Sequence, residues 1–130
     1  MATRTLEYRD GPVTCRGYLA YDDQRAGPRP AVVLFPEAFG LGEHVMDRAR
    51  RLAALGYVAL AADPYGSGAT ARDMPHALEL MGGVRGDVDR WRARARAALD
   101  ALTAQPGVDV SKLAAIGYCF GGSTALWQLR

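Results

Sequence analysis

The sequence has few cysteines and no long apolar run, and each shortage excludes a class of protein. Its two cysteines, Cys15 and Cys119, are too few for the disulfide framework of a small secreted domain, so we expect a reducing, cytoplasmic location. No apolar run approaches the roughly 18 residues of a membrane span, and the N-terminus has no apolar segment typical of a signal peptide. A net charge of +2 is too small to argue for nucleic-acid binding. The sequence therefore predicts a soluble protein without a membrane or nucleic-acid partner.

The composition favours one compact domain over residues 1–130. Hydrophobic residues make up 49% of the chain, enough to bury a core. Short apolar runs bounded by turn residues predict strands at residues 5–9, 13–21, 31–35, 57–62 and 113–118. Helical spacing predicts helices at residues 43–55, 75–81 and 85–104, and another from residue 120 onward. Two glycines at 82–83 are expected to end the second of these helices.

The order of these elements favours a mostly parallel α/β sheet entered through an antiparallel hairpin. The Asp-Gly-Pro segment at residues 10–12 predicts a tight turn between the first two strands. The later strands alternate with helices, as in α/β proteins. The helix at 85–104 has an arginine-rich face between Arg90 and Arg96, which we interpret as a solvated surface rather than a nucleic-acid site.

The motif most typical of an active site is Gly-Tyr-Cys-Phe-Gly-Gly at residues 117–122. An apolar strand precedes it and a predicted helix follows, which is the context of a nucleophile elbow. Cys119 would project at a helix N-terminus, where the helix dipole favours a thiolate. The backbone N–H of Phe120 would then stabilise an oxyanion. A buried structural cysteine is the alternative, whereas a phosphate-binding loop fits the glycine spacing poorly.

A second candidate segment is Pro-Glu-Ala-Phe-Gly at residues 36–40, directly after the third predicted strand. Loops at the carboxyl ends of parallel strands hold the active sites of open α/β sheets. The backbone N–H of Ala38 would supply a second oxyanion donor. The carboxylate of Glu37, beside apolar neighbours, could exchange a proton with a thiol. A solvated glutamate that contacts a helix end is an equally good interpretation.

These two segments and the Asp-Pro-Tyr-Gly segment at residues 63–66 together resemble the dienelactone hydrolase family, over essentially the whole chain. The resemblance implies an α/β-hydrolase fold with strand order 1-2-4-3-5 and hydrolysis of ester or lactone carbonyls through Cys119. It assigns Glu37 a role in forming the thiolate when substrate binds. It also implies an arginine that binds a substrate carboxylate, with Arg72 and Arg85 as candidates, although a solvated role fits either equally. We expect neither a cofactor nor a metal.

The sequence also departs from the pattern of the family. An α/β-hydrolase triad needs an acid and a histidine after the nucleophile, and neither follows Cys119 within the 130 residues. The two histidines, His44 and His76, fit surface or helix-capping roles better than a general-base role. We therefore expect an α/β-hydrolase domain truncated after the elbow, similar to the N-terminal half of the family's proteins, with little or no activity.

Two other functions stay open. If the strand at 113–118 forms an exposed apolar edge, it would pair with another chain or with a second copy. The protein would then be a non-catalytic interaction module. An activated thiol at Cys119 would instead suit a redox-responsive protein.

Overall fold

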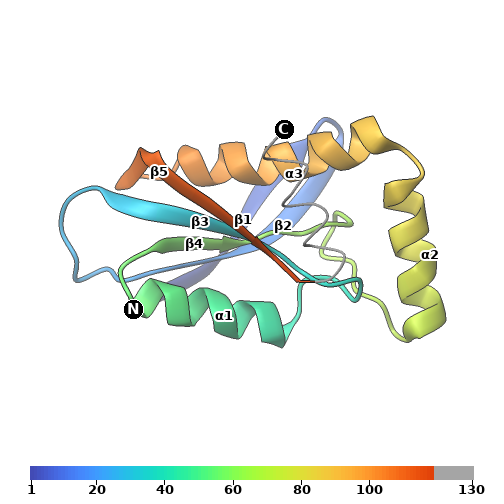
Figure 1. The fold of residues 1–130 in the computed structure, drawn as a ribbon, viewed down its shortest axis with the longest axis horizontal. Coiled ribbons are helices and arrows are strands. Elements are labelled where there is room, and N and C mark those ends of the chain that lie inside the picture. The colour runs from blue at the N-terminus through green and yellow to red at the C-terminus, as the bar shows by residue number, and fades with distance from the viewer. Residues whose placement is uncertain (119–130) are drawn as a thin grey trace.

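The structure, a computed structural model, describes residues 1–118, which form five strands and three helices. In chain order these are β1 (Ala2–Asp10), β2 (Val13–Tyr21), β3 (Arg29–Phe35), α1 (Glu43–Ala54), β4 (Val58–Ala61), α2 (Met74–Arg85), α3 (Val88–Thr103) and β5 (Val108–Gly117). The sheet runs between α1 and α3, and α2 stands at one end of the molecule (Figure 1). The helix predicted from residue 120 lies outside the described residues. Within residues 1–118, no helix is both long enough and apolar enough to cross a membrane.

The five strands form one sheet in the order β1-β2-β4-β3-β5. β1 and β2 pair antiparallel along their whole length, and the turn between them places Gly11 at a φ of +57°, a conformation that favours glycine. β2 is antiparallel to β4, whereas β3 is parallel to both β4 and β5. The predicted hairpin and the strand order implied by the resemblance are therefore confirmed. The sheet of the described residues is mixed, with the parallel pairings on both sides of β3 and the antiparallel pairings on both sides of β2.

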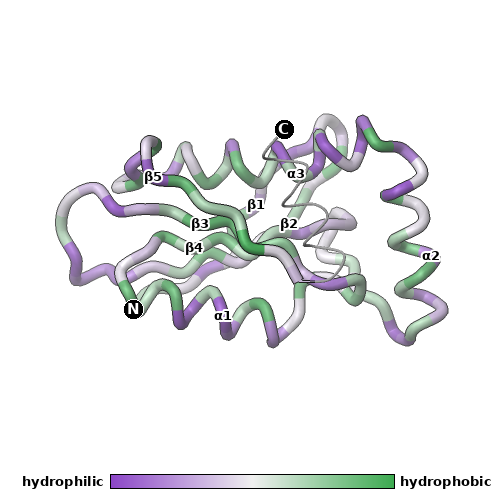
Figure 2. Tube along the Cα trace, viewed as in Figure 1, coloured by the Kyte–Doolittle hydropathy of each residue, from purple (hydrophilic) through white to green (hydrophobic). Residues whose placement is uncertain are grey.

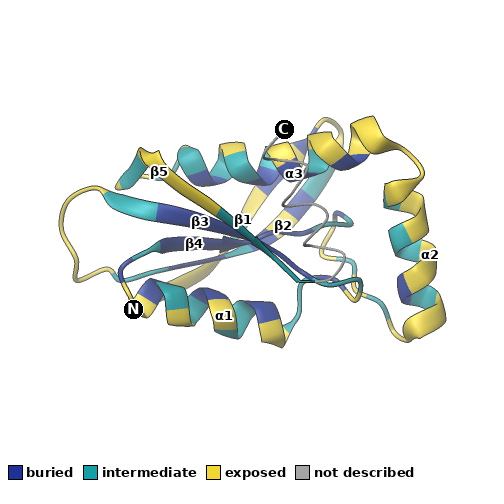
Figure 3. Ribbon diagram, viewed as in Figure 1, coloured by how far each residue is buried: buried dark blue, intermediate teal, exposed yellow. Residues whose placement is uncertain are grey.

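The central strands are buried on both faces, because α1 covers one face of the sheet and α3 covers the other (Figures 1 and 3). The layer under α1 contains Val32, Leu34, Val45, Ala49, Ala53, Ala59 and Ala61. The layer under α3 contains Ala31, Val33, Phe35, Leu60, Ala95, Ala98 and Leu102. Alternate residues of β3 thus enter opposite layers, which explains its continuous apolar run, coloured as hydrophobic in Figure 2.

The prediction that two glycines end the second helix is wrong. α2 spans Met74–Arg85 and passes through Gly82 and Gly83. Its start is fixed by Asp73, whose carboxylate accepts a hydrogen bond from the backbone N–H of His76 over 2.8 Å. Each interior glycine destabilises a helix by only about 1 kcal/mol relative to alanine. The cap at Asp73 offsets part of this cost, so the helix continues through both glycines.

The interpretation of the α3 arginines as a uniformly solvated face is also wrong for one of them. The side chain of Arg94 is 11% exposed, and its Nε lies 2.7 Å from Oδ2 of Asp10, which is 10% exposed. Its Nη1 also donates to the carbonyl of Pro64 over 3.4 Å. Arg94 therefore joins α3 to the β1–β2 turn and to the loop after β4, while Arg90 and Arg96 remain exposed.

The last described strand lies at an edge of the sheet. β5 begins at Val108 rather than at residue 113, and its pairing with β3 shifts register between Arg29 and Ala31. Residues 111–114 are exposed (Figure 3). Among the described residues, no strand pairs with the outer side of β5, so the predicted open edge is present in this part of the chain.

Candidate functional site

The loops that follow the parallel strands meet at the carboxyl ends of those strands. Glu37 follows β3 directly after Pro36, and Tyr118 follows β5. The backbone N–H of Tyr118 donates to the carbonyl of Phe35 over 3.2 Å. The fold therefore brings the glutamate loop beside the residue that precedes Cys119. Cys119 itself, and the Phe120 backbone donor, lie outside the described residues.

Glu37 is a partly buried carboxylate that contacts the first turn of α1. Its side chain is 29% exposed, and its Oε2 lies 3.3 Å from Nδ1 of His44. The N-cap residue of α1 is Gly42, which has no side chain to cap the helix. The carboxylate of Glu37 contacts a side chain of the first turn instead.

His44 is the residue at this site that the sequence interpretation assigned to a surface or capping role. Its imidazole is about half exposed and meets the Tyr118 ring edge-on, with the ring centroids 5.0 Å apart and the planes at 76°. His44 therefore contacts both the glutamate and the residue before the proposed nucleophile. Its position offers one sequence signal, because the first turn of a helix that follows a parallel strand lies at the same edge as the strand's carboxyl end.

Ala38 is held from the loop after β4. The hydroxyl of Tyr65 donates a hydrogen bond to the carbonyl of Ala38. Burial raises the pKa of Tyr65 to about 12, and the positive charge of Arg85 opposes that shift. The phenol is therefore protonated at neutral pH and can donate. This contact fixes the peptide that follows Ala38.

Two backbone hydrogen bonds tighten the same loop. The N–H of Gly40 donates to the carbonyl of Glu37 over 3.0 Å, and the N–H of Ala71 donates to the carbonyl of Phe39 over 2.9 Å. Gly40 has a φ of +96°, and a Cβ at this position would lie 3.0 Å from the carbonyl oxygen of Ala69. A side chain there would meet both strain and a backbone clash, so glycine is required for the two loops to approach.

Asp63 organises the loop after β4. Its carboxylate is 1% exposed and accepts hydrogen bonds from four backbone N–H groups, those of Arg16, Tyr65, Gly66 and Gly68, over 2.8–3.3 Å. Its own backbone N–H donates to the hydroxyl of Tyr8 over 3.0 Å. A buried carboxylate with this many donors is structural, and it positions Tyr65 for its contact with Ala38.

The two candidate substrate-binding arginines occupy different surroundings. Arg72 is exposed, and its backbone N–H donates to Nδ1 of His76 over 3.1 Å. Arg85 ends α2, with its guanidinium carbon 5.9 Å from the centroid of the Trp91 ring. The charge of Arg85 opposes the rise in the pKa of Tyr65. Arg72 directly follows Ala71, whose backbone N–H bonds the carbonyl of Phe39 in the same loop.

The other cysteine is a core residue. Cys15 is fully buried in β2, and burial raises the pKa of its thiol to about 11. It is therefore a thiol rather than a thiolate at neutral pH and is a poor nucleophile. Within residues 1–118, no three histidine, cysteine or acidic side chains gather as metal ligands.

Comparisons with known proteins show which family and which solved structures this chain is similar to. The model of the dienelactone hydrolase family matches residues 15–129. A Yersinia pestis protein that carries the name carboxymethylenebutenolidase is 38% identical over 120 residues, which cover 83% of this chain and 41% of the relative. The solved structure of m3DLH is 55% identical with a TM-score of 0.93, and that of a dienelactone hydrolase-like promiscuous phosphotriesterase from metagenomic libraries is 54% identical with a TM-score of 0.92. Each alignment covers 96% of this chain and 52% of the solved one. The chain thus spans about half the length of these structures and less of the curated relatives.

Proposed function

This chain belongs to the dienelactone hydrolase family and has the α/β-hydrolase fold, and from that premise we propose that it uses a cysteine nucleophile. Cys119 would attack ester or lactone carbonyls, and Glu37 would accept the proton of its thiol when substrate binds. The observation that carries the proposal is the position of Glu37, which lies partly buried at the carboxyl end of β3. The adjacent β5 leads directly into residue 119.

In the proposed mechanism, the thiolate sulfur forms a bond to the carbonyl carbon, and the carbonyl electron pair moves onto oxygen. The backbone N–H groups of Phe120 and Ala38 would stabilise this oxyanion. Collapse reforms the carbonyl and breaks the carbon–oxygen bond to the leaving group, which takes up the proton held by Glu37 and becomes an alcohol. The alcohol departs from an ester and stays attached to the acyl chain of an opened lactone. The acyl thioester left on Cys119 is then hydrolysed by water, which returns the thiol.

For substrates that carry a carboxylate, we propose an arginine as the binding group. Arg85 is one candidate, at the C-terminal end of α2. Arg72 remains the second candidate. Replacing each by glutamine and comparing how the rate of acylation depends on the concentration of an acidic and of a neutral ester would separate them. Only loss of the true binding residue should raise the half-saturating concentration of the acidic ester alone.

We further propose that the 130 residues react with esters but turn over slowly. They contain no acid or histidine after Cys119 to drive hydrolysis of the thioester. On mixing with p-nitrophenyl acetate, the chain should release at most about one equivalent of p-nitrophenolate. Peptide mass spectrometry should then locate the acetyl group on Cys119. Rapid turnover that Cys119→Ser abolishes would overturn the slow-turnover proposal, and acetylation at Cys15 would overturn the choice of nucleophile.

A second candidate function rests on the edge strand. Residues 111–114 of β5 are exposed, and Leu113 is 39% accessible. Leu113 and Ala114 are apolar, whereas Ser111 and Lys112 are polar. The unpaired backbone of this edge could still pair with another strand, so β5 could join this chain to a second copy or to another chain as a non-catalytic module. Light scattering tests self-pairing, with Leu113→Lys predicted to shift any dimer toward monomer. A monomer at all concentrations would remove the self-pairing form of this candidate.

We propose a cytoplasmic location as well. Cys15 is a free, buried thiol, which suits a reducing compartment.

A further inference from the structure

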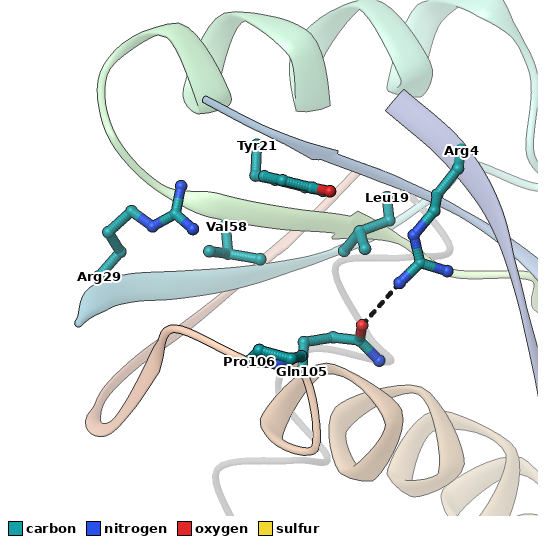
Figure 4. A pocket seen from close by; sticks show the side chains of 7 residues that line it. All are labelled: Arg4, Leu19, Tyr21, Arg29, Val58, Gln105 and Pro106. Atoms are coloured by element: carbon teal, nitrogen blue, oxygen red, sulfur yellow. Dashed lines mark hydrogen bonds between the residues drawn. The ribbon is translucent and has the colours of Figure 1, made fainter. Parts of the chain in front are cut away.

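A pocket of about 240 Å³ is lined by Arg29 and Val58 (Figure 4). These residues begin β3 and β4, so the pocket lies at the amino ends of the two strands, whereas Glu37 follows the carboxyl end of β3. Leu19 of β2 and Val58 of β4 are almost fully buried and contribute apolar surface, and the Tyr21 ring lies beside them. The guanidinium groups of Arg4 and Arg29 stand on the two sides of this apolar surface. The pocket therefore combines an apolar floor with two positive groups that come from separate strands.

Neither arginine is neutralised by an acid. Nη2 of Arg4 donates to the amide oxygen of Gln105 over 2.8 Å. Nη1 of Arg29 donates to the backbone carbonyl of Asp22 over 2.7 Å, and its guanidinium carbon lies 5.6 Å from the centroid of the Tyr21 ring. No ion pair in residues 1–118 involves either arginine, and Nε of Arg29 is buried without a hydrogen-bond partner there. Both guanidinium groups thus keep donor capacity beyond these neutral contacts.

No carboxylate lines the pocket together with the two arginines. α3 ends at Thr103, just before Gln105, and a helix C-terminus carries only about half a negative charge. The carboxylate of Asp22 is engaged elsewhere, since it accepts from the backbone N–H of Gln24 over 3.0 Å and from Nε of Arg25 over 3.3 Å. The two positive guanidinium groups therefore meet no acid among the residues that line the pocket.

We propose that this pocket binds a small organic carboxylate. Arginine presents paired N–H donors that match the two oxygens of a carboxylate, and the apolar floor would accept a compact hydrocarbon body. The volume is below the roughly 300–1,000 Å³ of pockets for drug-sized ligands, which limits the ligand to a small acid. The pocket does not involve Glu37 or Cys119, so this proposal stands or falls separately from the proposed hydrolase activity.

Benzoate is a suitable probe, with benzamide as its neutral counterpart and inorganic phosphate as an anion without an apolar body. Titrations of the 130-residue chain would be followed by backbone amide shifts. Benzoate should move the amides of Leu19, Tyr21, Arg29, Val58 and Gln105, while benzamide and phosphate should bind at least about tenfold more weakly. Equal binding of phosphate would show that charge alone is recognised, and equal binding of benzamide would show that charge is not recognised. Either result would overturn the proposal.

Three substitutions sharpen the test. Arg29→Gln should weaken benzoate binding at least about tenfold, whereas Arg48→Gln, which removes an exposed arginine of α1, should leave it unchanged. Gln105→Glu covers the case in which Arg29→Gln fails to fold. It places an acid beside Arg4, so it should preserve the fold and also weaken benzoate at least about tenfold. Benzoate binding that survives Gln105→Glu in a folded chain, or no benzoate binding by the original chain, would contradict the proposal.

Discussion

The two ends of the parallel strands are built in different ways. At the carboxyl ends, Asp63 and Tyr65 bond to backbone groups, and these contacts hold the loop that contains Glu37. At the amino ends, Arg4 and Arg29 stand over apolar side chains and bond only to neutral acceptors. The first arrangement fixes backbone where a reaction would need fixed N–H donors. The second leaves two guanidinium groups free to bind an anion. We therefore expect a rigid loop at the carboxyl ends and a charged binding pocket at the amino ends.

The largest expected effect comes from removing the carboxylate that organises the carboxyl end. Asp63→Ala leaves up to four backbone N–H groups without an acceptor, and we expect a loss of at least about 3 kcal/mol in the free energy of unfolding. Asp22→Ala is the matched control, because Asp22 also accepts from backbone but is partly exposed, with its side chain 25% accessible. It should cost less than about 1 kcal/mol. Equal losses of unfolding free energy for the two variants in urea denaturation would show that Asp63 does not organise the carboxyl end.

High pH should destabilise the protein next most strongly. The folded-state pKa values of Cys15 and Tyr65 are raised by burial to about 11 and about 12, and that of Tyr8 is also raised. A raised pKa disfavours ionisation in the folded state, so this stability is fully present below the pKa of the unfolded thiol, about 8.5, and is lost as pH rises through the folded-state pKa values. We expect a loss of about 2 kcal/mol between pH 8 and 11 in urea denaturation. Cys15→Ala should flatten the lower part of this decline, and a flat profile in the original chain would contradict the burial argument.

Tyr65→Phe should have a smaller effect that is confined to the carboxyl end. It removes the hydroxyl that bonds the Ala38 carbonyl, and such a bond contributes about 1 kcal/mol. Hydrogen exchange should quicken at the Gly40 and Ala71 amides, whose bonds tighten the same loop, and should stay unchanged at the amide of Arg29 in the amino end. Tyr57→Phe is the control, since Tyr57 lies outside this loop. Unchanged exchange at Gly40 would mean that Tyr65 does not hold the loop.

The smallest effect on stability is expected at His44. Its contact with Glu37 is partly exposed, with the two side chains 49% and 29% accessible, and such pairs contribute less than about 1 kcal/mol. His44→Gln should therefore change the free energy of unfolding by no more than about 0.5 kcal/mol. It should nevertheless shift the side-chain NMR resonances of Tyr118, because the two rings are in contact. A loss above about 2 kcal/mol would make His44 a core stabilising residue instead.

The sequence predicted those parts of the fold that depend on local patterns. Apolar runs such as that of β3 are buried on both faces, and turn residues locate the hairpin. The prediction for α2 was wrong because it gave more weight to the two glycines as helix breakers than to Asp73, which caps the start of the helix. Arg94 was misinterpreted because its partner Asp10 lies 84 residues away, and no periodicity along α3 reveals a contact of that range.

The sequence also predicted only some parts of the candidate site. The loop position of Glu37 followed from the sequence, because motifs after parallel strands gather at one edge of the sheet. Its contact with His44 did not, since a single histidine carries no pattern and the contact depends on the path of the loop. The pocket between Arg4 and Arg29 was equally hidden, because its walls come from four strands and the end of a helix. The roles of Cys119 and Phe120 remain predictions.

We propose that Glu37 and Cys119 act together. The rate at which p-nitrophenyl acetate acylates the chain at neutral pH is the best test of that proposal. The comparison uses the original chain, Glu37→Gln and Glu43→Gln, the last replacing an exposed glutamate in the first turn of α1. We expect Glu37→Gln to slow acylation of Cys119 at least about tenfold, because a general base is lost, and Glu43→Gln to leave the rate unchanged. Equal rates in all three proteins would contradict it.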